Sequence, residues 1–334
     1  MAQTTTIKVV SKTSETMPPA PSRFSGKYIF TTSPACDNYD WLVVHDEIPE
    51  CDIGTFKSGA ETLACPRSNT ILATWEPTSI KCYTRAYAAQ FAHLLSNRPW
   101  SAEKHPRYHL GRGYYRPMLG RSYDECAAIP FADKNDAVTA ICSSKAMRWT
   151  KHYARVQILK RLVAEVPGAM WYGHGVREFG KKWEVMDSSK YHVALENHID
   201  PHYWSEKITD AFLCECLPFY AGAPDLAEDF PAESFIPIPI DDPVEAVRII
   251  KDAVAHDEYS RRREAILEAK KLVLEKYNFW AQVVSIIEGA QKDGIADIED
   301  GAQAQIFSRK TVRRRNPLAA LEAGLFHLKQ YFPL

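Results

Sequence analysis

Residues 191–236 read YHVALENHIDPHYWSEKITDAFLCECLPFYAGAPDLAEDFPAESFI and contain the clearest structural signal in the chain. A buried strand is predicted over 191–196, a polar loop follows, and Asp200-Pro201 are residues that often begin a helix. The next helix is predicted over 207–214 and the next strand over 217–220. This order of elements is typical of an α/β domain with a parallel sheet.

Glu206 and Lys207 are expected in the first turn of that helix, at the carboxyl end of a strand. Backbone N–H groups and the helix dipole favour a phosphate there, and Lys207 adds a full positive charge. A neighbouring carboxylate can accept hydrogen bonds from ribose hydroxyls. Taken alone, the two residues are more typical of a surface ion pair on a solvated helix. Both interpretations stay open at this point.

The same rhythm of strands and helices extends along the chain. Strands are predicted over 7–10, 28–31, 41–44, 70–75, 138–142, 170–171 and 235–240. Helices are predicted over 150–163, 242–256 with Asp242 as N-cap, 259–277 and 279–289. The basic, aromatic segment 101–121 is predicted to contain loops. These patterns suggest an N-terminal domain over 1–135, a second domain over 136–295 and a tail over 296–334.

Composition limits the classes of function. At 334 residues with 46% hydrophobic residues, the chain is long enough for two globular domains. Its net charge of −1 provides no global attraction for nucleic acid, so an anionic ligand must be met by a local cluster. The eight cysteines lack paired metal-binding spacing and suggest reduced thiols in a cytoplasmic protein. No secretory signal and no apolar run of about 20 residues is visible.

A longer pattern within 191–236 resembles the donor-binding signature of glycosyltransferase family 10, the α-1,3-fucosyltransferases. Its pieces are Leu195-Glu196-Asn197, Tyr203-Trp204-Ser205-Glu206-Lys207, Pro218-Phe219-Tyr220-Ala221-Gly222-Ala223-Pro224 and Ser234-Phe235-Ile236. The resemblance implies a GT-B-like α/β fold, with two Rossmann-like domains facing a central cleft. It implies that Tyr203, Glu206 and Lys207 contact the GDP moiety, and places Glu196 and Asn197 in the same donor-binding segment.

A second piece lies upstream. Cys142-Ser143-Ser144, followed by Arg155 and the apolar Ile158, Leu159 and Leu162, is similar to the family's strand, serine loop and helix. These helical positions share one face, so Arg155 is expected at the edge of an apolar stripe. An arginine there could form two hydrogen bonds to a diphosphate. It could equally extend into water while its stem covers the core.

The catalytic base is expected in the first domain. Glu76 follows an apolar strand and resembles the family's general base, although Glu76-Pro77 replaces the family's Glu-Ser-Pro. Partial burial would raise the pKa of such a carboxyl into a useful range. Glu76 could also be a turn or N-cap carboxylate. His45-Asp46-Glu47 is a rival base that could equally be a solvated loop.

The resemblance therefore implies an inverting transfer of L-fucose from GDP-fucose to a hydroxyl of an oligosaccharide or glycolipid acceptor. No tightly bound cofactor is expected, and no metal is required, since cationic side chains can neutralise the leaving group. Two alternatives stay open: another GDP-linked sugar, and a non-catalytic glycan- or nucleotide-binding protein. Basic residues 309–315 precede an amphipathic run, which fits either peripheral contact with the inner face of a membrane or a disordered or partner-bound tail.

Overall fold

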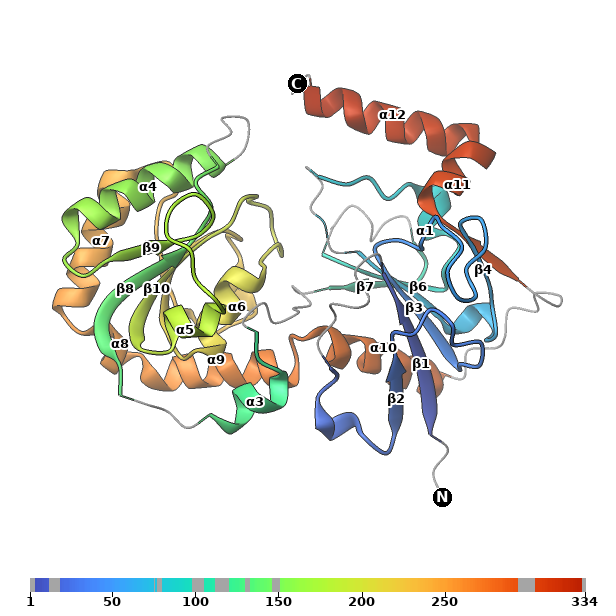
Figure 1. Ribbon diagram of the computed structural model, residues 1–334, viewed down its shortest axis with the longest axis horizontal. Coiled ribbons are helices and arrows are strands. Elements are labelled where there is room, and N and C mark those ends of the chain that lie inside the picture. Colours follow the sequence, from blue (N-terminus) through green and yellow to red (C-terminus); the bar gives the residue numbers. More distant parts are fainter. Residues whose placement is uncertain are drawn as a thin grey trace. The chain divides into compact units, whose positions relative to one another are not determined.

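The computed structural model describes residues 4–11, 19–74, 76, 80–97, 105–111, 120–129, 133–145, 151–293 and 304–331. The chain forms two compact units (Figure 1). Unit 1 contains residues 1–111 and 280–334, and unit 2 contains residues 112–279.

Unit 1 is built on a six-stranded sheet in the order β2-β1-β3-β5-β6-β7, and every pairing is parallel. These strands are β1 (Thr5–Val10), β2 (Tyr28–Thr31), β3 (Trp41–His45), β5 (Thr70–Ala73), β6 (His93–Ser96) and β7 (Tyr108–Leu110). A separate antiparallel pair joins β4 (Ala60–Thr62) to β13 (Gln305–Phe307). The described helices are η2 (Ser22–Phe24), η3 (Arg67–Asn69), α1 (Arg85–Ala88), α10 (Phe279–Asp293), α11 (Arg309–Arg315) and α12 (Pro317–Tyr331).

Unit 2 has a five-stranded parallel sheet in the order β12-β11-β10-β8-β9. Its strands are β8 (Asn135–Ile141), β9 (Met170–Tyr172), β10 (Ser189–Leu195), β11 (Leu217–Ala221) and β12 (Ile236–Pro237). Its helices are α3 (Tyr123–Ala128), α4 (His152–Glu165), α5 (Lys182–Met186), α6 (Glu206–Leu213), η4 (Leu226–Glu228), η5 (Ala232–Ser234), α7 (Pro243–Ala255), α8 (Glu258–Arg261) and α9 (Arg263–Glu275).

Two hydrophobic cores cover the two faces of the unit 2 sheet. Tyr191, Val193 and Leu195 of β10 pack with α4 and α7, whereas Ala194 packs with α6 and α9. Alternate residues of a strand point to opposite faces, so this near-continuous apolar strand is buried on both sides. Figure 1 shows α4 and α7 on one side of the sheet and α5, α6 and α9 on the other.

Both sheets have the same topology. Counted within its own main sheet, each unit has the strand order 2-1-3-4-5, which unit 1 extends by a sixth strand. This is a doubly wound, Rossmann-like order. The predicted α/β class with two Rossmann-like units is confirmed.

Several local predictions are also confirmed. Asp242 caps α7 by accepting hydrogen bonds from Val244 and Glu245, as its place before Pro243 predicts. Six of the eight cysteines are buried, and none forms a disulfide. Within segment 101–121, Tyr108–Leu110 forms edge strand β7, which the sequence did not predict, and residues 101–104 and 112–119 lie outside the described residues.

The boundaries of the two units differ from the expected domain boundaries near residues 135 and 295. α3 joins unit 2, where Cys126 is buried in the core beside α6. α10 belongs to unit 1 from Trp280 onward, and the Trp280 ring contacts Phe30 with 4.7 Å between centroids. The described residues 304–331 also belong to unit 1, since β13 pairs with β4 and Ala319 lies in the core. In the described part of the chain, no helix combines the length and apolar character needed to cross a bilayer.

Candidate functional site

The candidate site lies where the strand order of unit 2 reverses. β9 lies on one side of β8, while β10, β11 and β12 follow on the other. Connections leaving the carboxyl ends of β8 and β10 therefore diverge, and α/β sheets bind ligands at such points. Cys142 directly follows β8, and Glu196 directly follows β10.

Glu196 and Ser205 fix the start of α6. The Ser205 side chain accepts a hydrogen bond from the Lys207 backbone N–H, which makes Ser205 the N-cap. The buried Glu196 carboxylate accepts hydrogen bonds from the Ser205 backbone N–H at 2.8 Å and from its hydroxyl at 2.7 Å. The strand end and the helix start are thus joined by one buried carboxylate.

Lys207 extends back over this cap. Its Nζ lies 3.0 Å from the Glu196 carboxylate, 2.8 Å from the Ser205 hydroxyl and 3.3 Å from the Glu206 carboxylate. Burial favours the neutral amine, but the Glu196 and Glu206 charges prevail and raise the pKa of Lys207. Burial likewise opposes ionisation of Glu206, yet Lys207 and Lys182 lower its pKa to about 2. Both side chains are therefore charged at neutral pH.

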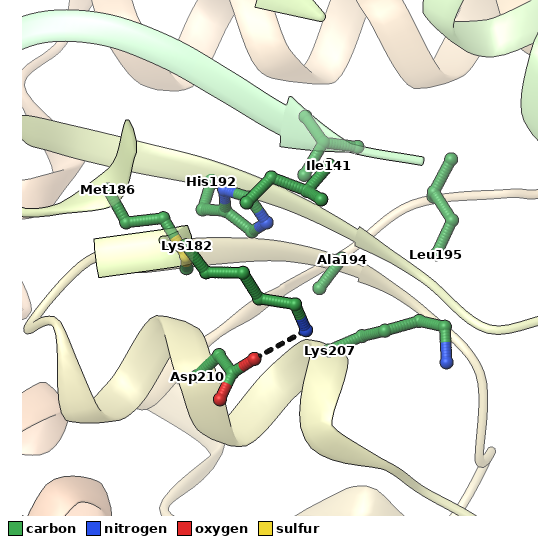
Figure 2. A pocket seen from close by; sticks show the side chains of 9 residues that line it. Ile141, Lys182, Met186, His192, Ala194, Leu195, Lys207 and Asp210 are labelled. Carbon is green, nitrogen blue, oxygen red and sulfur yellow. Dashed lines mark hydrogen bonds and ion pairs between the residues drawn. The ribbon is translucent and has the colours of Figure 1, made fainter. Parts of the chain in front are cut away.

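Lys182 is a further cation that sequence reasoning missed. It lies on α5, and its Nζ forms an ion pair of 2.7 Å with the buried Asp210 of α6 (Figure 2). Burial lowers the pKa of Lys182. Lys182, His192, Lys207 and Asp210 line a cavity of about 20 Å³, which has room for one water molecule and no more. Burial, assisted by Lys182, lowers the pKa of His192 to about 3, so that ring is neutral.

Arg155 is buried on α4 and does not extend into water. Its Nη2 donates to the Cys142 Sγ at 2.8 Å, whereas its Nε is buried without a hydrogen-bond partner among the described residues. A thiol is a weak acceptor and carries no compensating charge. The Arg155 charge also acts against protonation of Lys207 and of His152. A buried guanidinium with so weak an acceptor is energetically unfavourable.

Asn197 and Tyr203 lie in the loop between β10 and α6. The Asn197 side-chain oxygen is buried without a hydrogen-bond partner in the described part of the chain. Tyr203 is half-buried, and its ring lies edge-on to His198 with 5.3 Å between centroids. The structure thus brings five predicted donor-binding residues together at one loop and helix start, with Arg155 electrostatically coupled to Lys207.

An apolar cavity adjoins this loop. It has a volume of about 370 Å³ and lies at the carboxyl ends of β11 and β12, lined by Ile199, Tyr220, Gly222, Phe235 and Ile240 among others. A side chain at Gly222 would overlap the Tyr220 hydroxyl, and its Cβ would lie 2.6 Å from the Glu196 Cγ. The glycine therefore allows the cavity wall and the Glu196 carboxylate to approach closely.

The predicted base belongs to unit 1. Glu76 is half-buried and lies three residues after β5, while its neighbours Trp75 and Pro77 lie outside the described residues. The rival carboxylates after β3 are engaged by cations. Lys81 lies 3.5 Å from Asp46 and 3.4 Å from Glu47, and Arg309 lies 2.6 Å from Glu47.

One group of described side chains has the composition of a metal site. Ligand atoms of His202, Asp225 and Glu228 lie within 4.8 Å of one another. The His202 Nδ1 and an Asp225 oxygen are 2.6 Å apart, closer than the roughly 3.3 Å expected of two ligands of one tetrahedral ion. Asp225 also accepts the His202 backbone N–H, at 2.9 Å. As it stands, the contact of His202 with Asp225 links the loop before α6 to the segment that follows β11.

Comparisons with known proteins give structural likeness at low sequence identity. No protein-family model matches the chain, and no curated protein matches it significantly. It is similar to an α1,3-fucosyltransferase solved with GDP-fucose, with 15% identity and a TM-score of 0.47 over 83% of this chain and 93% of that one. It is similar to a glycosyltransferase from Rickettsia africae ESF-5, with 9% identity and a TM-score of 0.46 over 88% of this chain and 99% of that one. An Anabaena protein solved with UDP-glucose has 10% identity and a TM-score of 0.46 over 86% and 99%.

Proposed function

We propose that the chain is a glycosyltransferase that binds the diphosphate of a GDP-linked sugar at the start of α6 and transfers the sugar to a glycan hydroxyl. The observation that carries this proposal is the buried guanidinium of Arg155, which among the described residues has a weak thiol acceptor and no paired carboxylate, coupled to Lys207 at the switch point of the sheet. The fucosyl donor rests on the resemblance of residues 191–236 to family 10.

The charges of the site suit a diphosphate better than a single small anion. Arg155 presents a planar guanidinium with an unused Nε, and Lys207 presents a rotatable ammonium. The N-terminus of α6 adds backbone N–H groups and the positive end of its dipole. Arg155 on α4, and Lys207 with the backbone N–H groups at the start of α6, can each meet a different phosphate oxygen.

The apolar cavity supports a nucleotide rather than inorganic pyrophosphate as the ligand. Its volume of about 370 Å³ falls within the range of small-molecule sites, and apolar and aromatic side chains form much of its wall. In this proposal the nucleobase enters the cavity and the ribose lies near Glu206. The loop from Asn197 to Tyr203 joins the phosphate end to the base end.

Catalysis in this proposal is a single displacement with inversion. Arg155, Lys207 and the α6 terminus stabilise the charge that develops on the departing GDP, an interaction that grows in the transition state. Glu76 removes the proton from the acceptor hydroxyl as that oxygen attacks the anomeric carbon. Asp46 and Glu47 are weaker choices because Lys81 and Arg309 already neutralise them.

The proposal is tested by calorimetric titration with GDP, UDP, GDP-fucose and GDP-mannose, followed by an assay for GDP release. We expect GDP to bind and UDP to bind more weakly, and GDP-fucose to be turned over in the presence of a glycan acceptor. Turnover of GDP-mannose instead would support a glycosyltransferase whose donor sugar is mannose and not fucose. Binding without GDP release, with any acceptor of a glycan panel, would leave a nucleotide-binding protein.

Glu76→Gln separates the base from the donor site. This variant should bind GDP-fucose as the wild type does while its kcat falls about 100-fold or more. The matched control is Glu50→Gln, which changes an exposed carboxylate of the same unit. An unchanged kcat in Glu76→Gln would refute the assigned base without touching the diphosphate site.

A further inference from the structure

α12 packs on unit 1 with its four leucines exposed. Ala319 and Ala323 are buried against the unit, with exposures of 1% and 4%. Leu318, Leu321, Leu325 and Leu328 are 51% to 76% exposed. A helix stabilised only by its own unit would bury its leucines, because their removal from water contributes far more than that of alanine.

The four leucines form one continuous stripe. Their spacing of three, four and three residues places them on a single face of a helix, opposite the buried alanines. Glu322 is half-buried and accepts a hydrogen bond from the backbone N–H of Arg85, the first residue of α1, at 3.0 Å. It is the single carboxylate between Arg309 and Tyr331. The outward face of α12 is therefore apolar.

α11 adds positive charge directly before the leucines. Its seven residues, RKTVRRR, include five cations, and Lys310, Arg314 and Arg315 are exposed. α11 is held to unit 1 by the buried Val312 and by the 2.6 Å ion pair of Arg309 with Glu47. The cations and the leucines are thus presented by one anchored helix pair, which Figure 1 shows as consecutive red helices.

We propose that α11 and α12 together dock on an anionic lipid surface, with the leucine stripe in the interfacial layer and the α11 cations against lipid phosphates. Interfacial helices combine these two features, and neither alone holds a protein firmly on a membrane. A second copy of the chain is a poorer occupant. A pairing of α12 with α12 would cover the leucines but give the α11 cations no anionic partner, because Glu322 is the single carboxylate between Arg309 and Tyr331.

Vesicle co-sedimentation tests this inference, which does not depend on the nucleotide site. The wild type is mixed with vesicles of phosphatidylcholine alone or with added phosphatidylglycerol. We expect binding to the anionic vesicles that weakens as ionic strength rises, since salt at 1 M shortens the screening length to about 3 Å. Two double variants separate the apolar contribution to binding from the electrostatic one. The leucine variant combines Leu321→Ser with Leu325→Ser, and the charge variant combines Lys310→Glu with Arg314→Glu.

The leucine variant should lower partitioning at least about tenfold, and the charge variant should abolish the preference for anionic vesicles. Matched controls are Val244→Ser and Lys251→Glu on α7, where both residues are exposed. They should bind vesicles as the wild type does. Absence of vesicle binding by the wild type, or binding that neither variant reduces, overturns the proposal. So does a leucine-dependent dimer, measured by light scattering without lipid, that binds no vesicles.

Discussion

Arg155 is informative because its guanidinium is buried and its hydrogen-bonding capacity is not fully used by the described residues. Among the described residues its Nε has no partner, and its Nη2 donates to a thiol. Arg155→Met should therefore leave the free energy of unfolding unchanged or raise it by about 1 kcal/mol, since it removes a poorly compensated buried charge. The affinity for GDP should fall about 100-fold, because charge-assisted hydrogen bonds to phosphate are lost.

Chemical unfolding and calorimetric titration measure the two effects separately. The matched control is Arg161→Met on the same helix, where Arg161 is paired with Glu165 at 2.7 Å and is 39% exposed. This control should bind GDP normally. A large loss of stability in Arg155→Met, with GDP affinity retained, would make Arg155 a structural residue.

His192 predicts a pH dependence of stability. Its folded pKa of about 3 lies below the ordinary value of 6.5, chiefly because the ring is buried. The unfolded chain therefore takes up the proton first, and stability falls as pH drops from 6.5 toward 3. Between pH 7 and pH 5 the free energy of unfolding should fall by about 2 kcal/mol more in the wild type than in His192→Gln.

Denaturant unfolding of both proteins at the two pH values measures this difference. Glu206 does not interfere, because the stability that its lowered pKa confers is lost only below its ordinary value of 4.5 and down to about 2. Equal pH dependence in the two proteins would show that His192 titrates normally in the folded state.

The residues of the site differ in how visible they are in the sequence. Ser205, Glu206 and Lys207 are contiguous, so one local pattern predicts their place at a helix start. Lys182 and Asp210 are separated by 28 positions, and no local periodicity pairs them. Burial of Arg155 without a counter-ion in the described part of the chain depends on the packing of α4 against β8, which the sequence alone does not reveal.

The start of α6 is the element on which the site depends. Ser205 caps α6 and its hydroxyl also donates to the buried Glu196, so Ser205→Ala removes a cap and one donor at once. The free energy of unfolding of unit 2 should fall by about 1 kcal/mol for the lost cap. It should fall by up to about 3 kcal/mol more because the Glu196 carboxylate is less satisfied. GDP affinity should fall as well, because Lys207 would be drawn more closely to Glu196.

Ser122→Ala provides the comparison for this change. Ser122 caps α3 of the same unit in a reciprocal capping box with Glu125. Its loss should cost about 1 kcal/mol and leave GDP affinity unchanged. Thermal unfolding and GDP titration of the two variants distinguish a general loss of stability from a local loss of the binding geometry.

Helices and strands are predictable where a cap residue or a hydrophobic pattern lies within the element. They are less predictable where long-range packing determines the secondary structure. The cap at Asp242 and the apolar run of β10 gave α7 and a buried strand close to their observed bounds. β7 was missed because its three residues are half-buried and become a strand only by pairing with β6. The helix expected over 259–277 is divided into α8 and α9 at Arg262, with no proline or glycine to signal the break.

The division into two units follows long-range contacts rather than chain order. Unit 2 is one continuous segment, whereas unit 1 is completed by the chain that returns after residue 279. Local composition shifts suggested boundaries near 135 and 295, since neither Trp280 packing on Phe30 nor β13 pairing with β4 is visible in a local window. The strand order, by contrast, is the same in both units.

This organisation predicts that GDP stabilises the two units unequally. All the proposed donor-binding residues lie in unit 2, which has cores on both faces of its own sheet. Differential scanning calorimetry should resolve two transitions, of which GDP raises only one. At a GDP concentration 100 times the Kd, the stabilisation of that transition should be about 2.7 kcal/mol.

A fragment of residues 112–279 identifies the transition. It should unfold cooperatively near the GDP-sensitive temperature of the full chain and bind GDP within about threefold of the full-chain affinity, a difference below 1 kcal/mol. Arg155→Met in the full chain should abolish the GDP-induced shift and leave the other transition in place. If GDP raised both transitions equally, or if the folded fragment failed to bind it, the ligand would need unit 1, and the assignment of the diphosphate to α6 alone would be wrong.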